Sequence, residues 1–454
     1  MNGKPDIDLY YGSQTTVSGN APMEVGILNL FAGSNPFRLL NNCESFSTDS
    51  ITTYYPVSSN TWYFFTPMHD IKLSDIRHTA NASFVFRFYN GQQRATSGTG
   101  NSWQNVNDGM LHAGQGYIFH CNANGDLIMP AVKESKDVVF TTGEFTKALT
   151  TFESDNSANK NWNYVGNPYP CYYDIHYMDF TAPITIRRDN NYYAYSISDD
   201  DYVLSPMQSF FVQKPDAIDN IVFRPEGRQL SPTVNRATYV KKLKMAEIQS
   251  RFIYNIELSS DDKTDRTRVV LNEEKSTNYD MDCDAAKFMS DDSSIPQLYT
   301  IDANGTRMAI NERPKGNGVM NLGVAMVAGK TYILSSSRHD GNIYLKDNET
   351  GKTTDLTIDS YSFTAGETTE TTARFTLSFI ENKTTDVEDA IIKDVQIIGN
   401  VGSLNIITSA SCSIQVYNVY GSLEASANKA TTFNLPAGIY FVKVNGVTTK
   451  AVVR

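Results

Sequence analysis

The sequence predicts an all-β protein made of consecutive antiparallel β-sandwich modules, with a small C-terminal Ig-like β-sandwich at the end. The 454 residues include 26 Tyr and 23 Phe, and flat aromatic rings pack well on pleated strands. Strand-length runs alternate with Gly, Pro and Asn-Gly turn signals along the whole chain. A pair of segments also recurs at long spacing, which is typical of duplicated β modules.

One recurring segment begins with a tryptophan, and the other is marked by a glutamine before an aromatic strand. Trp62 and Trp162 each open a short apolar strand that a proline stops. Gln115 and Gln208 each stand in a frame that begins with Leu and leads into an aromatic strand. The order of the segments repeats, and so does their rough spacing. We therefore expect two related all-β units, not a short-period solenoid.

Changes in composition divide the chain into four modules. The first and second copies of the repeat are expected in residues 1–130 and 131–235, either as two domains or as one. A β-sandwich should follow at 245–383, and a last module at 390–454. This last module should hold about seven short strands, with a hairpin turn at Asn445–Gly446. Its size is near the lower limit for independent folding.

Turn chemistry predicts several local features of the first half. Asn90-Gly91 follows an aromatic run and predicts a hairpin, because both residues tolerate positive φ. The polar stretch 92–100 is then an exposed loop, and Val138–Phe140 begins a later strand. We assign both Trp62 and Trp162 to apolar cores.

Charge and hydropathy restrict the partners. Lys and Arg total 39 against 50 Asp and Glu, which gives a formal net charge of −11. A nucleic-acid partner is not expected, because it requires a basic face. No apolar run approaches the roughly 20 residues of a transmembrane helix. The residues after Met1 lack a signal-peptide core. Either the protein is cytoplasmic, or it is exported and the signal peptide is absent from this sequence; we favour export.

No catalytic residue is predicted. The sequence contains neither an HExxH nor a GxSxG motif. His112 and His120 could share one strand face and a metal, although ordinary surface histidines are the commoner case. The five cysteines are widely spaced without a CxxC pair, so a zinc ribbon is not expected. We interpret the chain as non-enzymatic.

An acidic loop at Asp199, Asp200 and Asp201 offers a possible calcium site, since oxygen-rich loops of extracellular β-proteins bind this ion. The alternative is a solvated turn in which Asp accepts local backbone hydrogen bonds. No other cofactor is expected.

Four aromatic residues in or near loops offer a ligand site for sugars: Trp103, Tyr172, Tyr173 and Tyr193. Exposed rings can stack on sugars while neighbouring Asn and Asp bind hydroxyl groups. The alternative is that these rings pack in the core, as most strand aromatics do.

The C-terminal segment 399–454 contains Ile414-x-Val416-Tyr417-Asn418-x-x-Gly421, the turn Leu435-Pro436-Ala437-Gly438 before an alternating strand, and a basic residue close to the end. It resembles the C-terminal sorting domain of type IX secretion substrates of Bacteroidetes. The sorting-domain positions in this sequence are Gly421, Gly438, Tyr440, Lys443 and Lys450. A final strand with few Lys or Arg departs from the family pattern.

Earlier segments are similar to modules that often precede such a domain in surface proteins. Their pieces are Trp162-Asn163-x-x-Gly166-Asn167-Pro168-Tyr169-Pro170, Pro206-x-Gln208-x-Phe210-Phe211-Val212, Asp284-Ala285-x-Lys287, Ala309-Ile310-Asn311 and Leu345-Lys346-Asp347.

The resemblance implies export by a cleaved signal peptide and passage across the outer membrane, with residues 390–454 contacting the secretion machinery. We expect a secreted or cell-surface protein with an adhesive, structural or binding role and no transmembrane segment. The alternative is a carbohydrate-binding appendage of a polysaccharide-using surface system. Its further partners would be a glycan or a host or cell-surface protein.

Overall fold

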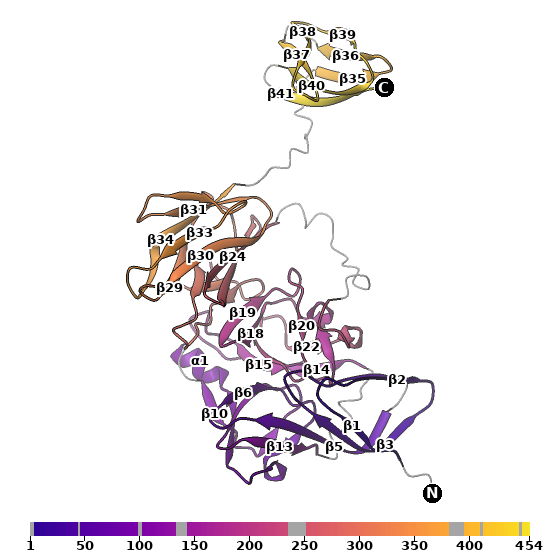
Figure 1. Ribbon diagram of the computed structural model, residues 1–454, viewed down its shortest axis with the longest axis vertical. Helices are drawn as coiled ribbons and strands as arrows, with labels where there is room; N and C mark the ends of the chain where they lie inside the picture. Colours follow the sequence, from indigo (N-terminus) through magenta and orange to yellow (C-terminus); the bar gives the residue numbers. More distant parts are fainter. Residues whose placement is uncertain are drawn as a thin grey trace. The chain divides into compact units, whose positions relative to one another are not determined.

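The computed structural model describes residues 4–43, 46–98, 102–132, 143–234, 251–380, 395–408, 412–444 and 447–454. These form two compact units, 1–380 and 381–454. Strands dominate both units (Figure 1), so the prediction of an all-β fold is confirmed. The predicted strand start at Val138–Phe140 and the turn at Asn445–Gly446 lie outside the described residues.

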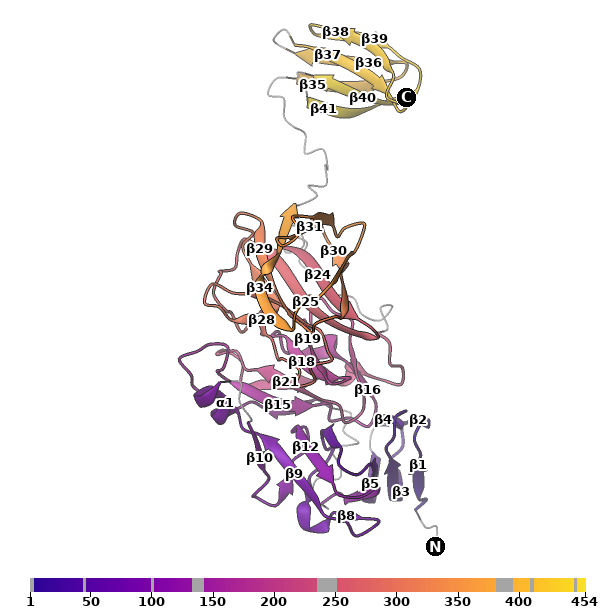
Figure 2. The ribbon, with the colours of Figure 1, turned by 60° about the vertical axis from the view of Figure 1, so that its left-hand side comes forward.

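The first strands of the chain form stacked parallel coils, which the sequence reading missed. Strand β3 pairs in parallel with both β1 and β5, and β2 pairs in parallel with β4. Figure 2 shows β1, β3 and β5 side by side. The antiparallel strand β13 continues the sheet beyond β5. The five strands are β1 (Ile7–Leu9), β2 (Gln14–Gly19), β3 (Met23–Phe31), β4 (Arg38–Cys43) and β5 (Phe46–Val57).

The first copy of the repeat follows and contains a four-stranded antiparallel sheet of order β10-β9-β12-β6. Its elements are β6 (Trp62–Phe65), β7 (Ile71–Lys72), η1 (Leu73–Asp75), β8 (Arg77–His78), β9 (Phe84–Tyr89), α1 (Gly91–Ser97), β10 (Trp103–Asn105), β11 (Met110–Leu111), β12 (Tyr117–Cys121) and β13 (Gly125–Pro130).

The second copy has the matching sheet, of order β19-β18-β21-β15. The strand–3₁₀–strand segment β7–η1–β8 of the first copy also recurs as β16–η3–β17. The two segments therefore share one strand order and one strand–3₁₀–strand segment. The elements of the second copy are β14 (Phe145–Ala148), β15 (Trp162–Gly166), β16 (Tyr172–Asp174), η3 (Ile175–Tyr177), β17 (Met178–Asp179), β18 (Ile184–Arg188), β19 (Asn191–Tyr195), β20 (Val203–Leu204), β21 (Ser209–Gln213), β22 (Asn220–Phe223), η4 (Pro225–Gly227) and β23 (Arg228–Gln229).

Reciprocal backbone hydrogen bonds join the two copies. Thr66 N donates to Met207 O at 2.9 Å, and Gly166 N donates to Gly114 O at 3.1 Å. Thr66 and Gly166 occupy equivalent positions after their tryptophans, and Gly114 and Met207 precede the two repeated glutamines. Both of these last residues have positive φ, 71° for Gly114 and 59° for Met207. The two copies therefore bind each other through their repeated tryptophan and glutamine segments.

Two local predictions in the first copy are wrong. Residues 91–97 form helix α1, not a hairpin turn and an exposed loop. The Asn90 side chain accepts a hydrogen bond from Gln93 N and thereby caps the helix. Trp62 is 39% exposed because β6 is an edge strand, whereas Trp162 is 2% exposed and buried as predicted.

Residues 251–380, called the third block below, form one eleven-stranded sheet that closes over a single core. Residues from both ends of the sheet, such as Leu345 and Phe363, belong to that core. The strands are β24 (Arg251–Ser260), β25 (Lys263–Asn272), β26 (Ala285–Ala286), β27 (Gln297–Ile301), β28 (Arg307–Arg313), β29 (Val319–Met326), β30 (Thr331–His339), β31 (Asn342–Asp347), β32 (Thr353–Asp355), β33 (Tyr361–Thr364) and β34 (Thr369–Ile380).

The described residues of the C-terminal unit form seven strands, where about seven were expected, in sheets of order β35-β36-β39 and β38-β37-β40-β41 around their own core. Along the described part of the chain, no helix is long and apolar enough to cross a membrane. The strands are β35 (Val395–Asn400), β36 (Ser403–Thr408), β37 (Ile414–Asn418), β38 (Leu423–Ala427), β39 (Thr431–Asn434), β40 (Gly438–Val444) and β41 (Val447–Val453).

The junction between the copies predicts a steric test at Gly166. A Cβ atom there would press on Thr66 Oγ1 and lie 2.5 Å from Gln208 O. We expect Gly166→Ala to lower the free energy of unfolding by about 1–3 kcal/mol, because backbone atoms must move. Gly366→Ala is the matched control, since its Cβ would meet nothing within 4 Å. Urea unfolding followed by tryptophan fluorescence measures both variants, and equal midpoints would contradict the account of the junction.

Candidate functional site

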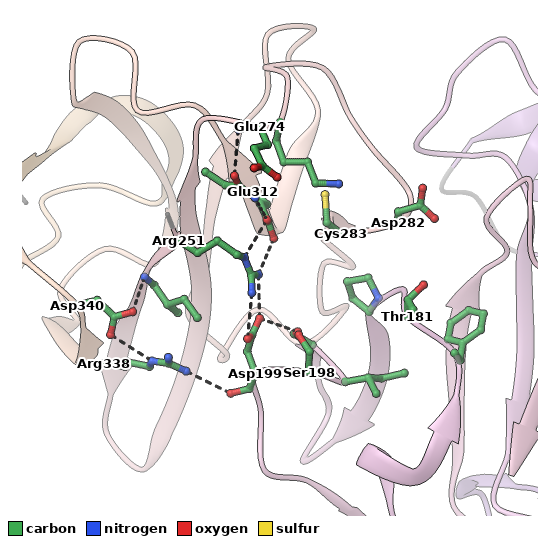
Figure 3. A pocket seen from close by; sticks show the side chains of 17 residues that line it. Thr181, Ser198, Asp199, Arg251, Glu274, Asp282, Cys283, Glu312, Arg338 and Asp340 are labelled. Carbon is green, nitrogen blue, oxygen red and sulfur yellow. Dashed lines mark hydrogen bonds and ion pairs between the residues drawn. The ribbon is translucent and has the colours of Figure 1, made fainter. Parts of the chain in front are cut away.

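A polar cleft of about 610 Å³ lies between the second copy and the third block. Figure 3 shows Thr181, Ser198 and Asp199 of the second copy on one side, and Arg251 and Glu312 of the third block on the other. We call the whole contact between these two parts the seam. The ion pairs of Arg251 with Asp199 and Glu312 belong to both the cleft and the seam.

Arg251 occupies the centre of the cleft and bridges its two walls. Its Nη1 and Nη2 atoms donate to the two Asp199 carboxylate oxygens at 3.3 and 3.0 Å. Its Nε and Nη2 atoms donate to the Glu312 carboxylate at 3.1 and 2.8 Å. Burial raises the pKa of the Asp199 carboxyl, but the Arg251 charge outweighs that effect and the net pKa is lowered. This two-sided bidentate arrangement is a strong brace.

The neighbouring Asp200 is also held by arginines. Arg266 Nη1 donates to Asp200 Oδ1 at 3.2 Å, and Arg268 donates to the same oxygen. Asp201 Oδ1 lies 3.8 Å from His176 Nε2. The acidic loop expected to bind calcium therefore binds guanidinium groups, and an ion at Asp199 or Asp200 would have to displace them. The described residues contain no group of three or more His, Cys, Asp or Glu suited to a metal.

A fully buried ion pair lies deeper in the seam. Lys287 Nζ donates to both carboxylate oxygens of Asp265 at 2.6 Å, and both side chains are 0% exposed. Asn191 of the second copy donates to Asp265 Oδ1 at 3.0 Å, and Leu298 N donates to Oδ2 at 2.6 Å. All four bonds are needed because an ionised carboxylate without water must be satisfied by protein groups.

Aromatic packing completes the seam. The Phe288 ring of the third block lies 4.8 Å from the Trp162 ring and 4.9 Å from the Phe211 ring, centroid to centroid. The Arg94 guanidinium from helix α1 lies 4.6 Å from the Phe288 centroid. Helix α1 therefore positions a cation over the aromatic cluster.

The structure does not bring the four predicted sugar-binding aromatics together. Tyr172 and Tyr173 are buried, at 7% and 0% exposure. Trp103 packs edge to face on Tyr164 at 5.3 Å in the cluster around Trp162 and Phe211. Tyr193 donates its hydroxyl to Thr264 O at 2.6 Å in the seam. Packing, the alternative considered above, therefore accounts for their positions.

The sequence assigned no role to Cys283 and named Asp284 only within a recurring piece, yet the structure places Cys283 at the cleft and Asp284 just behind it. Burial, together with the Asp284 and Asp280 carboxylates, raises the pKa of the Cys283 thiol, so it stays protonated at neutral pH. The Asp284 carboxylate accepts hydrogen bonds from Glu312 N at 2.7 Å and Asp280 N at 2.9 Å. Burial nevertheless raises the pKa of Asp284 to about 7.

Most charged side chains of the cleft form ion pairs with one another. Arg251 is shared by Asp199 and Glu312, and Arg338 Nε lies 3.6 Å from Asp340. Lys275 Nζ, on the rim, donates to Asp280 at 3.1 Å. The arrangement thus holds the two walls of the cleft together.

The sorting-domain positions fall into structural and exposed groups. Gly421 has a φ of 79° in the turn after β37, and Gly438 is the first residue of β40. Tyr440 is 6% exposed and donates its hydroxyl to Pro436 O at 3.0 Å. Lys443 is half-buried and Lys450 is exposed. Lys450 is therefore the position most open to a partner.

The buried pair predicts a large effect at Asp265. Asp265→Asn leaves the Lys287 charge buried without a counter-ion, so we expect a loss of about 3–5 kcal/mol in the free energy of unfolding. Asp261→Asn is the matched control, because Asp261 pairs with Lys330 at the surface and its side chain is 73% exposed; its loss should stay below about 1 kcal/mol. Urea unfolding measures both. Equal losses would contradict the structural role of the pair.

The pKa of Asp284 predicts a pH dependence. Its value of about 7 in the folded state exceeds the ordinary carboxyl value of 3.8, so the folded state binds more protons between those values. The free energy of unfolding contributed by this group therefore falls as pH rises from about 4 to 7. We expect Asp284→Asn to lose less stability than the native chain between pH 5 and pH 8. Parallel urea-unfolding profiles for the two proteins would contradict this.

The family comparison matches residues 172–379 to a family described as "Domain of unknown function (DUF8693)". The matched segment begins at β16 and ends in β34, so it contains the ion pairs of the seam, although Trp162 lies before it, and it crosses the boundary expected between the second copy and the third block. The chain matches none of the curated proteins.

Proposed function

We propose that this chain is a non-catalytic, secreted or cell-surface binding protein, with its C-terminal unit addressing it to a type IX-like secretion route. The observation that carries the proposal is an exposed apolar face on the C-terminal unit. Ile439, Phe441 and Val452 are 40%, 40% and 49% exposed on adjacent strands β40 and β41.

The register of the two strands gathers these side chains. Ile439 stands opposite Val452, and Phe441 stands opposite Lys450. Residues two apart on a strand point to the same face, so the apolar side chains and the exposed Lys450 lie on one surface. Apolar patches of this kind mark protein interaction sites. An apolar strip beside a cation fits recognition by a protein receptor, and by the resemblance to sorting domains this receptor would be the secretion machinery.

The larger unit supports the binding role. Its prominent ionic groups, Asp199, Arg251, Asp265 and Lys287, are engaged in bracing contacts. A rigid body of this sort suits adhesion or ligand capture. Carbohydrate binding remains the second candidate, because exposed rings gather at the first coils, where Tyr10 and Tyr11 are 51% and 67% exposed.

The test is export of the full chain behind a periplasmic signal peptide in a bacterium that has type IX secretion. We expect the full chain to reach the cell surface or medium, while a chain ending at Ile380 and the Phe441→Ser variant stay in the periplasm. Tyr420→Ser is the matched control, since Tyr420 is 90% exposed in the turn after β37 and should leave export unchanged. Export of the shortened chain at the full-length level would contradict the proposal.

A further inference from the structure

Three aromatic rings form a stacked ladder across the first coils. The Tyr10 and Phe31 rings are 4.5 Å apart at 12°, and the Phe31 and Tyr54 rings are 4.6 Å apart at 13°. Parallel pairing produces this ladder, because Phe31 stands opposite Tyr54 and Leu9 stands opposite Leu30. The ladder ends at Tyr10, which therefore has no further ring stacked on its outer face within the described residues.

The turn that carries Tyr10 and Tyr11 is held rigidly. Ser13 N donates to Tyr10 O at 3.0 Å, and Gly12, whose φ is 77°, donates its N–H to Asn35 O at 2.8 Å. Tyr11 lies against Gly33, where an added Cβ would come within 2.8 Å of Tyr11 Cβ. Both tyrosines are more than half exposed, yet their backbone is fixed. A fixed exposed ring loses little entropy when a ligand binds.

A hollow of about 410 Å³ opens beside these rings. Ser34 and Asp126 line it together with the ladder. The side chains of Tyr10, Tyr11, Tyr54, Ser34 and Asp126 make no hydrogen bond within the described residues. The hollow thus combines flat apolar rings with free hydroxyl groups and one free carboxylate.

We propose that this hollow binds a neutral carbohydrate, an inference that rests on the carbohydrate-binding form of the proposed function. The C–H face of a sugar ring can lie on Tyr10 or Tyr11, while its hydroxyl groups bond to Asp126 and the free tyrosine hydroxyls. The carboxylate and the net charge of −11 disfavour an anionic glycan.

A neighbouring hollow gives the site room for more than one sugar unit. It has a volume of about 470 Å³, shares Gly33, Ser34 and Pro56 with the first, and continues toward Tyr63 and Gln208. Gln208 belongs to the second copy, so the surface extends from the coils to the junction between the copies. The occupant is therefore an oligosaccharide or a segment of polysaccharide.

An added β-strand fits the same place less well. Strand β1 is only three residues long. Charged residues lie within it and beside it: Asp8 in the strand accepts a hydrogen bond from Asn29, Asp6 accepts one from Ile27 N, and Lys4 pairs with Asp49. Short, charged edge strands resist pairing with another chain. A sugar needs the rings and hydroxyl groups but not the strand edge.

The test is isothermal titration of the full chain with soluble neutral polysaccharides, namely a β-glucan, a mannan and a xylan, and with polygalacturonate as the anionic probe. We expect at least one neutral probe to bind, and Tyr11→Ala to weaken it by about tenfold or more through lost stacking. Asp126→Asn should also weaken it. Tyr420→Ala, which changes a tyrosine of the other unit that is 90% exposed against 67% for Tyr11, should bind as the native chain does.

Three results would overturn the proposal: no binding of any neutral probe, binding of polygalacturonate alone, or neutral binding that neither Tyr11→Ala nor Asp126→Asn changes. Thermal melting checks that each variant folds. If Tyr11→Ala fails to fold, Asp126→Asn alone still tests the site. Export of Tyr11→Ala separates the two proposals, because loss of sugar binding with normal export leaves the secretion route intact.

Discussion

The larger unit depends on the buried ion pair between Asp265 and Lys287. Neither side chain contacts solvent, and Asn191 of the second copy supplies one of the hydrogen bonds that satisfy the carboxylate. Such a pair does little for stability compared with apolar packing, but it permits only one arrangement of its surroundings, because a misplaced partner leaves a charge unpaired. The Arg251 brace and the Phe288 cluster add strength around this fixed point. The polar cleft is the open end of the same contact.

A second set of contacts extends this rigidity to the first copy. The bonds Thr66–Met207 and Gly166–Gly114 join equivalent positions of the two copies, so the same kind of contact is made from both sides of the junction. Helix α1 then reaches the third block through Arg94. Coils, copies and third block therefore form one body, which presents the aromatic hollow at one place and the polar cleft at another. The family match from 172 to 379 follows the seam, not the module boundary expected from composition.

The sequence predicted features that depend on local pattern. Strand runs, turn residues and the spacing of Trp62, Trp162, Gln115 and Gln208 lead to the fold class and the duplication. The piece Asp284-Ala285-x-Lys287 was also noticed, although only the structure shows that Lys287 meets Asp265. Features that depend on distant partners were not predictable: an acidic loop looks the same whether calcium or arginine neutralises it. The parallel coils were missed because the pairing partners lie far apart in the sequence and the coil repeats only briefly, with Ile7 opposite Leu28 and Leu28 opposite Ile51.

The central claim is that the seam, and not the covalent connection, holds the second copy and the third block together. The most direct measurement is co-expression of residues 1–240 and 245–380 as two separate chains, followed by size-exclusion chromatography. The account predicts that the two chains co-elute as a one-to-one complex, and that neither is stable alone because each would expose one side of the seam. Two chains that fold and elute separately would contradict it.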